Sequence, residues 1–350
     1  MKHLFLLFLV CSVFTSAFAY DVLSENIYFN LNKDEKTATV TYKKIVPGQE
    51  RKEYYHDIVI PTEIKVKGVK YQVVAIGDSA FYGCDDVDSV ELPATITHIG
   101  KSAFENFRCK YGASFLAGYT RAITSIGERA FANSTIECSF ASEKLMSIGK
   151  EAFLNAIVEK IIINDSIQRI EEAAFKGCKY LKDVEIADIK HWCEIDFATM
   201  YSNPLVMTHD LSLSNQKLNT LTVPNGVTTI KPHVFARTNI TELFLPNSVQ
   251  HIDRWSFYEC ENLKIIHLPA SVQKISAGAF SGCYKVNIIF IDNPDIIIEE
   301  NNFTIFSGYL IVAPGTAEKF MQNPLWSKCT ILESDKLEQL TTLEKEQPES

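Results

Sequence analysis

The chain has 350 residues, of which 46% are hydrophobic, and a formal net charge of −9. This composition supplies a large apolar core and argues against wholesale disorder, while the length fits either two globular domains or one elongated repeat array. The acidic excess argues against a broad nucleic-acid interface and against unaided binding to an anionic membrane, because both need clustered Lys and Arg.

The first 19 residues are typical of a cleavable export signal. Lys2 gives a basic start, an apolar run extends from Leu4 to Phe14, and small side chains end the segment at Ala19. The run is shorter than the roughly 20 residues that a membrane-spanning helix needs, and no later segment is long and apolar enough. We therefore expect a signal peptide at 1–19, cleavage near Ala19, and a secreted or cell-surface protein without a transmembrane segment.

The next segment, residues 20–72, predicts an N-terminal β-hairpin cap and a first strand. Residues 27–31 and 37–42 are rich in strand-forming side chains and flank a polar turn at 32–36. Residues 58–61 read Ile-Val-Ile-Pro, which resembles the strand of the repeats that follow. A repeat array needs such a cap, because its first coil would otherwise expose an apolar end.

Downstream of residue 72 the sequence repeats in a fixed register. An isoleucine is followed five residues later by a phenylalanine, and most neighbouring pairs are 22 or 23 residues apart. The pairs are Ile76/Phe81, Ile99/Phe104, Ile126/Phe131, Ile148/Phe153, Ile170/Phe175, Ile230/Phe235, Ile252/Phe257 and Ile275/Phe280. This period predicts stacked coils of about 23 residues that bury Ile and Phe in one shared core. We assign leucine-rich-type repeats to residues 73–186 and 218–292.

Each coil also contains a short segment with apolar residues at alternate positions. Residues 87–93 (Val-Asp-Ser-Val-Glu-Leu-Pro) and 263–269 (Leu-Lys-Ile-Ile-His-Leu-Pro) show this pattern. Alternation indicates a strand with one buried face, and the closing Pro ends the strand because Pro has no N–H to donate. Each coil is thus expected to have a strand on one side and a turn with Ile and Phe on the other.

Residues 76–84 (Ile-Gly-Asp-Ser-Ala-Phe-Tyr-Gly-Cys) and 90–93 (Val-Glu-Leu-Pro) resemble the BspA-type leucine-rich repeat of secreted and surface proteins. The resemblance covers about residues 58–292. It implies a β-rich, α/β-type repeat solenoid, right-handed, with parallel strands on the concave face and turns or short helices on the other side. It also implies a non-catalytic binding or adhesion module whose partner is an extracellular protein or glycan. The family has no shared catalytic residues.

Three segments depart from the repeat pattern. Residues 187–217 lie in the 60-residue gap between two Ile/Phe pairs, and we expect an irregular insert there, formed by a distorted coil or a bulging loop. Residues 293–333 look like the closing element of the family and are expected to form a C-terminal cap. Residues 334–350 are charged and poor in large apolar groups, which is typical of a mobile tail.

The insert contains His191, Cys193 and Glu194, which could suggest a nucleophile with a base. Neighbouring residues on an extended segment point to opposite faces, so the spacing alone does not make a catalytic triad. The sequence has no Cys-x-x-Cys pair and no hydrolase, Walker or dinucleotide motif. We therefore expect no enzymatic activity, no cofactor and no metal. A structural surface spacer and an exported hydrolase with a site in 187–217 stay open as alternatives.

Eight cysteines follow the expected signal peptide. Four stand three residues after a repeat phenylalanine and could form a disulfide or metal ladder, or act as small buried hydrophobic residues: Cys84, Cys178, Cys260 and Cys283. The second interpretation is favoured, because layer-related positions of a solenoid rarely meet disulfide geometry. The other four fall outside this register, and a bridge among them stays open: Cys109, Cys138, Cys193 and Cys329.

The outward strand positions of the last three coils are unusually apolar. They are Phe244, Ile265, His267, Ile288 and Phe290. Contiguous exposed apolar side chains usually mark a contact site, so this stripe is the candidate partner-binding surface. Coverage of the stripe by the C-terminal cap or by residues 293–308 is the alternative. We expect a monomer that binds an extracellular protein or glycan and no nucleic acid.

Overall fold

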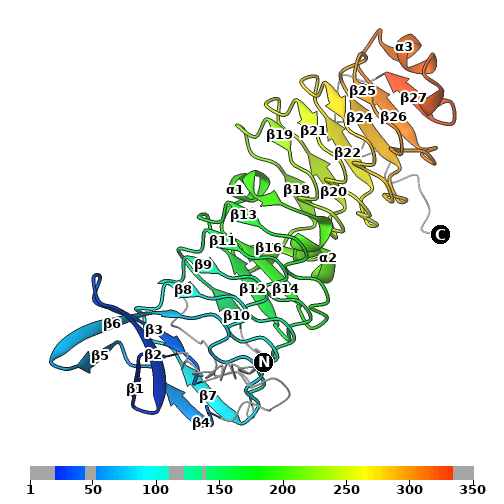
Figure 1. The fold of residues 1–350 in the computed structure, drawn as a ribbon. Coiled ribbons are helices and arrows are strands. Elements are labelled where there is room, and N and C mark those ends of the chain that lie inside the picture. Colours follow the sequence, from blue (N-terminus) through cyan, green and yellow to red (C-terminus); the bar gives the residue numbers. More distant parts are fainter. Residues whose placement is uncertain (1–19, 44–52, 110–121, 136–138, 334–350) are drawn as a thin grey trace, which may run out of the picture.

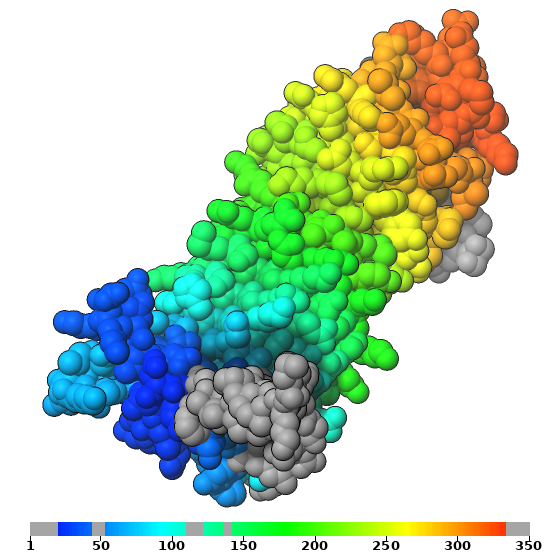
Figure 2. Space-filling view, viewed as in Figure 1, coloured from blue at the N-terminus to red at the C-terminus, as the bar shows by residue number. Residues whose placement is uncertain are grey.

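The protein is an elongated column of stacked coils (Figure 1). The computed structural model describes residues 20–43, 53–109, 122–135 and 139–333. The expected signal peptide, the expected charged tail and Cys138 lie outside these residues. The coils follow one another in sequence order along one axis and make about 10 turns, and the described residues form one continuous rod (Figure 2). The predicted β-rich repeat solenoid with parallel strands is confirmed.

Antiparallel hairpins precede the repeats. Their strands are β1 (Val22–Ser24), β2 (Ile27–Asn32) and β3 (Thr37–Thr41), followed by β5 (Glu63–Val66) and β6 (Val69–Ile76). β3 pairs in parallel with β6, and β6 pairs in parallel with the first short strand of the repeats. The hairpins therefore extend a sheet of the solenoid. The Tyr54 ring lies 4.7 Å from the Phe81 ring, and the Tyr54 hydroxyl donates to the Thr41 carbonyl at 2.5 Å, which closes this end of the core.

One side of the column, here called the long-strand face, carries the strands that the alternating segments predict. They are β4 (His56–Val59), β7 (Val87–Glu91), β10 (Ser139–Ala141), β12 (Lys160–Ile163), β14 (Asp183–Ile186), β16 (Leu211–Leu213), β17 (Gln216–Lys217), β18 (Thr220–Thr222), β20 (Glu242–Phe244), β22 (Ile265–Leu268), β24 (Ile288–Ile291), β26 (Tyr309–Val312) and β27 (Thr330–Glu333). These strands form three sheets, β4–β7, β10–β17 and β18–β27, and within each sheet neighbours pair in parallel except β16 and β17, which form a hairpin. Leu243, Ile266 and Ile289 stand opposite one another and are fully buried, so the alternation correctly predicts the inward side.

A second side of each coil carries a strand of only two residues, which contains the recurring Ile or, in β15, Phe197 in its place. These strands are β8 (His98–Ile99), β9 (Ser125–Ile126), β11 (Ser147–Ile148), β13 (Arg169–Ile170), β15 (Asp196–Phe197), β19 (Thr229–Ile230), β21 (His251–Ile252), β23 (Lys274–Ile275) and β25 (Ile297–Ile298). The sequence predicts only turns or short helices here. Across the described residues, helices occur in the insert and near the C-terminus: α1 (Ile189–Glu194), η2 (Met200–Ser202), α2 (Leu205–Thr208), α3 (Ala317–Met321) and η3 (Pro324–Trp326).

The repeat phenylalanines form the centre of the core, as predicted. Between Phe81 and Phe175, successive rings are 5.0 to 5.4 Å apart and stack with nearly parallel planes. From Phe235 to Phe303 the same arrangement resumes at 5.0 to 5.5 Å. We call these two runs the phenylalanine spine. Such ring pairs add to the stabilisation from area burial alone, so each coil is stabilised by its neighbours.

Candidate functional site

Phe244, His267 and Phe290 form a continuous stack of rings on the long-strand face. They occupy equivalent positions on β20, β22 and β24, because the three strands pair in parallel and in register. The His267 ring centroid is 4.0 Å from that of Phe244 and 4.4 Å from that of Phe290, with planes tilted by 14° and 4°. We call these three residues the aromatic stack.

Ile265 and Ile288 lie beside the aromatic stack, and here the expected exposure needs correction. Ile288 is buried, with 4% of its surface exposed, and Ile265 is half-buried. The cause is the register: Ile288 stands between Ile265 and Tyr309 on the two flanking strands, whose side chains cover it. The rings of the aromatic stack are also half-buried, because equivalent side chains pack face to face. The stripe is therefore narrower and less exposed than the sequence predicts.

The C-terminal residues continue the sheet beside the aromatic stack. β26 and β27 pair in parallel after β24, which places Ile311 opposite Phe290. β25 pairs with β23 in the sheet of short strands, so residues 293–308 contribute an ordinary coil. The long-strand face thus extends without a break from β18 to β27.

Charge is distributed unevenly along the long-strand face. On the earlier coils, Lys160 lies 3.1 Å from the Asp183 carboxylate and 2.7 Å from that of Glu185. In the aromatic stack, the His267 Nε2 atom is 3.2 Å from a Glu242 oxygen. Burial lowers the pKa of His267 from its ordinary value of 6.5, and the contact with Glu242 opposes this shift only in part. The stack is therefore uncharged near neutral pH.

His191, Cys193 and Glu194 lie on a helix, α1, and not on an extended segment as the sequence analysis assumes. The Asp188 side chain accepts a hydrogen bond from the His191 backbone N–H at 3.0 Å and begins this helix. Cys193 is buried, which raises the pKa of its thiol to about 12, so the reactive thiolate does not form at neutral pH. The His191 side chain contacts the Ile167 carbonyl at 2.8 Å. Among the described residues, His191 is therefore paired with a backbone carbonyl and not with the Cys193 thiol.

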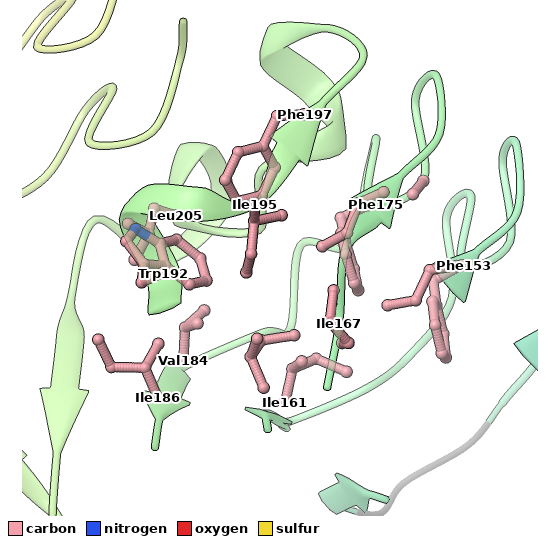
Figure 3. Packing of buried hydrophobic residues seen from close by; sticks show 14 of the residues in the cluster. Phe153, Ile161, Ile167, Phe175, Val184, Ile186, Trp192, Ile195, Phe197 and Leu205 are labelled. Carbon is pink, nitrogen blue, oxygen red and sulfur yellow. The ribbon is translucent and has the colours of Figure 1, made fainter. Parts of the chain in front are cut away.

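The insert completes a distorted coil of the column. β15 pairs with β13 so that Phe197 stands opposite Ile170, and Ser202 consequently takes the place of the repeat phenylalanine. The Trp192 ring fills the space, 5.2 Å from the Phe197 ring, and Figure 3 shows it beside Leu205, beyond Phe175 along the column. Its indole N–H donates to the Val234 carbonyl of the next coil at 2.9 Å.

A pocket that the sequence analysis does not predict lies on the turn side of the column. It has a volume of about 500 Å³ and is lined by Ala198, Thr199, Met200, Tyr201, His233, Trp255 and Tyr258. The repeat position of Tyr201 is the feature of the sequence that could have predicted this pocket. The N–H of Phe175 donates to the Tyr201 carbonyl, just as that of Phe153 donates to the Ala174 carbonyl. Tyr201 thus stands where most coils have Ala, and an alignment of the repeats across the insert would have revealed it.

The cysteines of the repeats behave as small buried residues. Cys178 and Cys260 are fully buried, and their Sγ atoms contact the carbonyls of Phe153 and Phe235 in the preceding coils. Burial raises the pKa of the Cys178 thiol to about 12. Cys193, Cys283 and Cys329 are free thiols. Among the described residues, no three His, Cys, Asp or Glu side chains gather as a metal site requires, and no helix is long and apolar enough to cross a membrane.

Comparison with known proteins gives a consistent result. The family model described as "BspA type Leucine rich repeat region" matches residues 62–182, 117–200 and 208–338, in six copies. A leucine-rich repeat protein from Bacteroides ovatus is 18% identical over 90% of this chain and 100% of its own, with a TM-score of 0.38. One from Eubacterium ventriosum is 16% identical over 89% and 84%, with a TM-score of 0.44. The pneumococcal vaccine antigen PcpA is 17% identical over 90% and 98%, with a TM-score of 0.41. No curated protein matches the sequence.

Proposed function

Since the chain belongs to the BspA-type leucine-rich repeat family, we propose that it is a secreted or cell-surface, non-catalytic module that binds an extracellular protein or glycan. The observation that carries this proposal is the aromatic stack. Phe244, His267 and Phe290 are held by three paired strands, so their rings are ordered before a partner arrives. A preordered aromatic surface loses little conformational entropy on binding and is typical of contact hot spots.

The chemistry of the described titratable groups supports a non-catalytic role. Cys193 is buried and keeps its proton at neutral pH. His267 is neutral and packed between two rings, with Glu242 at its edge and no nucleophile in contact. A hydrolase site in 187–217 would need a base that activates a nucleophile, and the contacts of His191 and Cys193 do not supply one.

Removal of the aromatic stack tests this proposal. Phe244→Gln and Phe290→Gln, made together, should lower capture by immobilised extracellular matrix proteins and mucin-type glycans by about ten-fold or more, because both ends of the stack are lost. Capture is measured by surface plasmon resonance, and circular dichroism shows whether the variant is folded. Thr222→Gln is the matched control, since Thr222 stands opposite Phe244 on β18 and is exposed.

The alternative outcome distinguishes a binding module from a surface spacer. A spacer would show no saturable capture of any protein or glycan in the panel. A folded double variant that captures its partner as well as the unchanged protein would contradict a role for the aromatic stack.

A further inference from the structure

The pocket on the turn side is separate from the aromatic stack. His233 and Trp255 follow the short strands β19 and β21, whereas Phe244 and His267 lie on the long strands. Its volume of about 500 Å³ falls within the range that small-molecule sites usually have. The far wall of the pocket consists of residues 198–201, which belong to the distorted coil of the insert.

Aromatic side chains at positions that are not aromatic in the earlier coils build this pocket. Tyr201 occupies the place of the repeat Ala. His233 and Trp255 stand three residues after the strand isoleucine, where other coils have Ser79, Ser102, Arg129 or Glu151. All of these residues except Tyr201 have a positive φ of 51° to 64°, so the backbone turn is common to the repeats and only the side chains are special.

Trp255 rests on the next coil. A Cβ atom on Gly278 would lie 3.0 Å from the Trp255 indole, so the glycine leaves room for the ring. On the preceding coil, the His233 ring stacks on the Trp255 ring, with ring centroids 5.3 Å apart and planes tilted by 20°. Burial lowers the pKa of His233 from 6.5, which keeps its ring uncharged near neutral pH. The His233 Nδ1 atom is buried and has no hydrogen-bond partner among the described residues, which is unusual.

Aromatic surface remains exposed to solvent in this pocket. Trp255 is 42% exposed and Tyr201 is 39% exposed, whereas the residues of the aromatic stack are half-buried. Tyr258 adds a third ring, and the neighbouring Glu259 carboxylate gives the rim a polar edge and raises the pKa of Tyr258. Glu259 in turn lies 3.0 Å from Arg237. The pocket thus combines ring surfaces with hydrogen-bonding groups at its rim.

Two cations flank the exposed rings. The Lys176 ammonium lies 5.7 Å from the centre of the Tyr201 ring, and the Arg254 guanidinium lies 5.4 Å from that of Trp255. Neither forms an ion pair within the part of the chain that the structure describes. Glu299, whose carboxyl pKa the Arg254 charge helps to lower, is paired with Lys274 at 2.6 Å. A cation held only by a ring keeps its charge available to an anion.

We propose that this pocket binds a sugar ring that carries a carboxylate, such as a uronic or sialic acid unit of a glycan. A pyranose has an apolar C–H surface that packs on aromatic rings and hydroxyls that need hydrogen-bonding partners. Tyr201, Trp255 and Tyr258 supply the rings, and the Tyr258–Glu259 edge supplies polar partners. Lys176 and Arg254 supply the charge for the carboxylate. An apolar peptide would leave the two cations and the polar rim unused, so the sugar fits better.

Trp255 provides a built-in reporter for the test. The chain has three tryptophans, and Trp192 and Trp326 are only 1% and 2% exposed. Acrylamide quenching of tryptophan fluorescence therefore reports mainly on Trp255. The probes are sialyllactose, a hyaluronan tetrasaccharide and digalacturonic acid, compared with neutral lactose and cellobiose. At least one acidic probe should protect Trp255 from quenching, with an affinity about ten-fold or more above the neutral sugars, and high salt should weaken it.

Variants assign the binding to the proposed residues. Lys176→Gln and Arg254→Gln, made together, should remove the preference for the acidic probe, as measured by saturation-transfer NMR. Trp255→Ala should abolish its binding. The matched controls are Lys179→Gln and Tyr180→Ala, because both residues are exposed, Tyr180 does not line the pocket, and Lys179, unlike Lys176, does not lie over one of its rings.

Three results would overturn the proposal. None of the acidic probes binds; a neutral sugar or a Leu/Phe-rich peptide binds as tightly as the best acidic probe; or the Lys176/Arg254 variant binds that probe unchanged. Circular dichroism confirms that each variant is folded. Because the aromatic stack lies elsewhere on the coils, capture at that surface can persist when the pocket fails, and the two proposals fail independently.

Discussion

His267 shows how a single side chain can make the protein sensitive to pH. It lies between the rings of Phe244 and Phe290, and Glu242 and Asp292 are the acidic groups that interact with it. Burial lowers its pKa from 6.5 in the folded protein. Below pH 6.5 the unfolded chain therefore binds a proton more readily than the folded chain, and the free energy of unfolding falls as the pH decreases.

We predict that this loss is smaller in His267→Phe, which keeps a ring in the stack but cannot take up a proton. Urea unfolding at about pH 7.5 and about pH 5.5 measures the change, which is limited to about 1.4 kcal/mol per unit of pKa difference. His233, whose pKa is also lowered by burial, adds to the fall in the free energy of unfolding at low pH. Asp292, whose carboxyl pKa is raised by burial, changes the free energy of unfolding in the opposite direction. Equal losses in the protein and in the variant would show that His267 is not the titrating group.

Residue-level features were only partly predictable. Alternation in residues 263–269 correctly places Ile266 inside and His267 outside. It does not predict that Ile288 is covered, because coverage comes from Tyr309 on the next strand. The stacking of rings from neighbouring coils is likewise a contact between residues that are distant in the sequence, so no local sequence pattern predicts it.

The insert is the element that differs most from the repeats, and Trp192 joins it to the column. Its ring is buried 5.2 Å from the Phe197 ring, and its indole N–H donates to the Val234 carbonyl in the following coil. Trp192→Ala should therefore lower the free energy of unfolding by about 3–5 kcal/mol, as expected when a large buried side chain leaves a cavity. Chemical denaturation monitored by circular dichroism measures the loss.

Trp255→Ala is the matched control for Trp192→Ala, because it removes the same side chain from a site that is 42% exposed. We expect its cost to be well below that of the buried site. Similar costs for both substitutions would mean that Trp192 does not fill the core, and that the insert packs independently of the column.

At the level of elements, the long strands follow from the sequence and the short ones do not. A segment such as 263–269 has enough alternation to indicate a strand, whereas two residues such as Ser125–Ile126 have no period at all. α1 was missed because its first turn lies in an irregular segment, although Asp188 is a suitable N-cap. The pocket was missed because it needs Tyr201 and Trp255 side by side across the insert.

At the scale of the whole molecule, the repeat period predicts the solenoid because each coil contacts only its neighbours. One register therefore determines the path of most of the chain. The family match over residues 62–200 and 208–338 agrees with this architecture. The two proposed binding surfaces lie on different sides of the same column, so one elongated protein could hold two partners without a change in shape.

A crystal structure that resolves the side chains tests the shared phenylalanine spine most directly. We predict ring centroids 5.0 to 5.5 Å apart from Phe81 to Phe175 and again from Phe235 to Phe303, with Trp192 filling the gap between the two runs. A structure in which these rings face solvent, or in which residues 187–217 fold apart from the column, would contradict it.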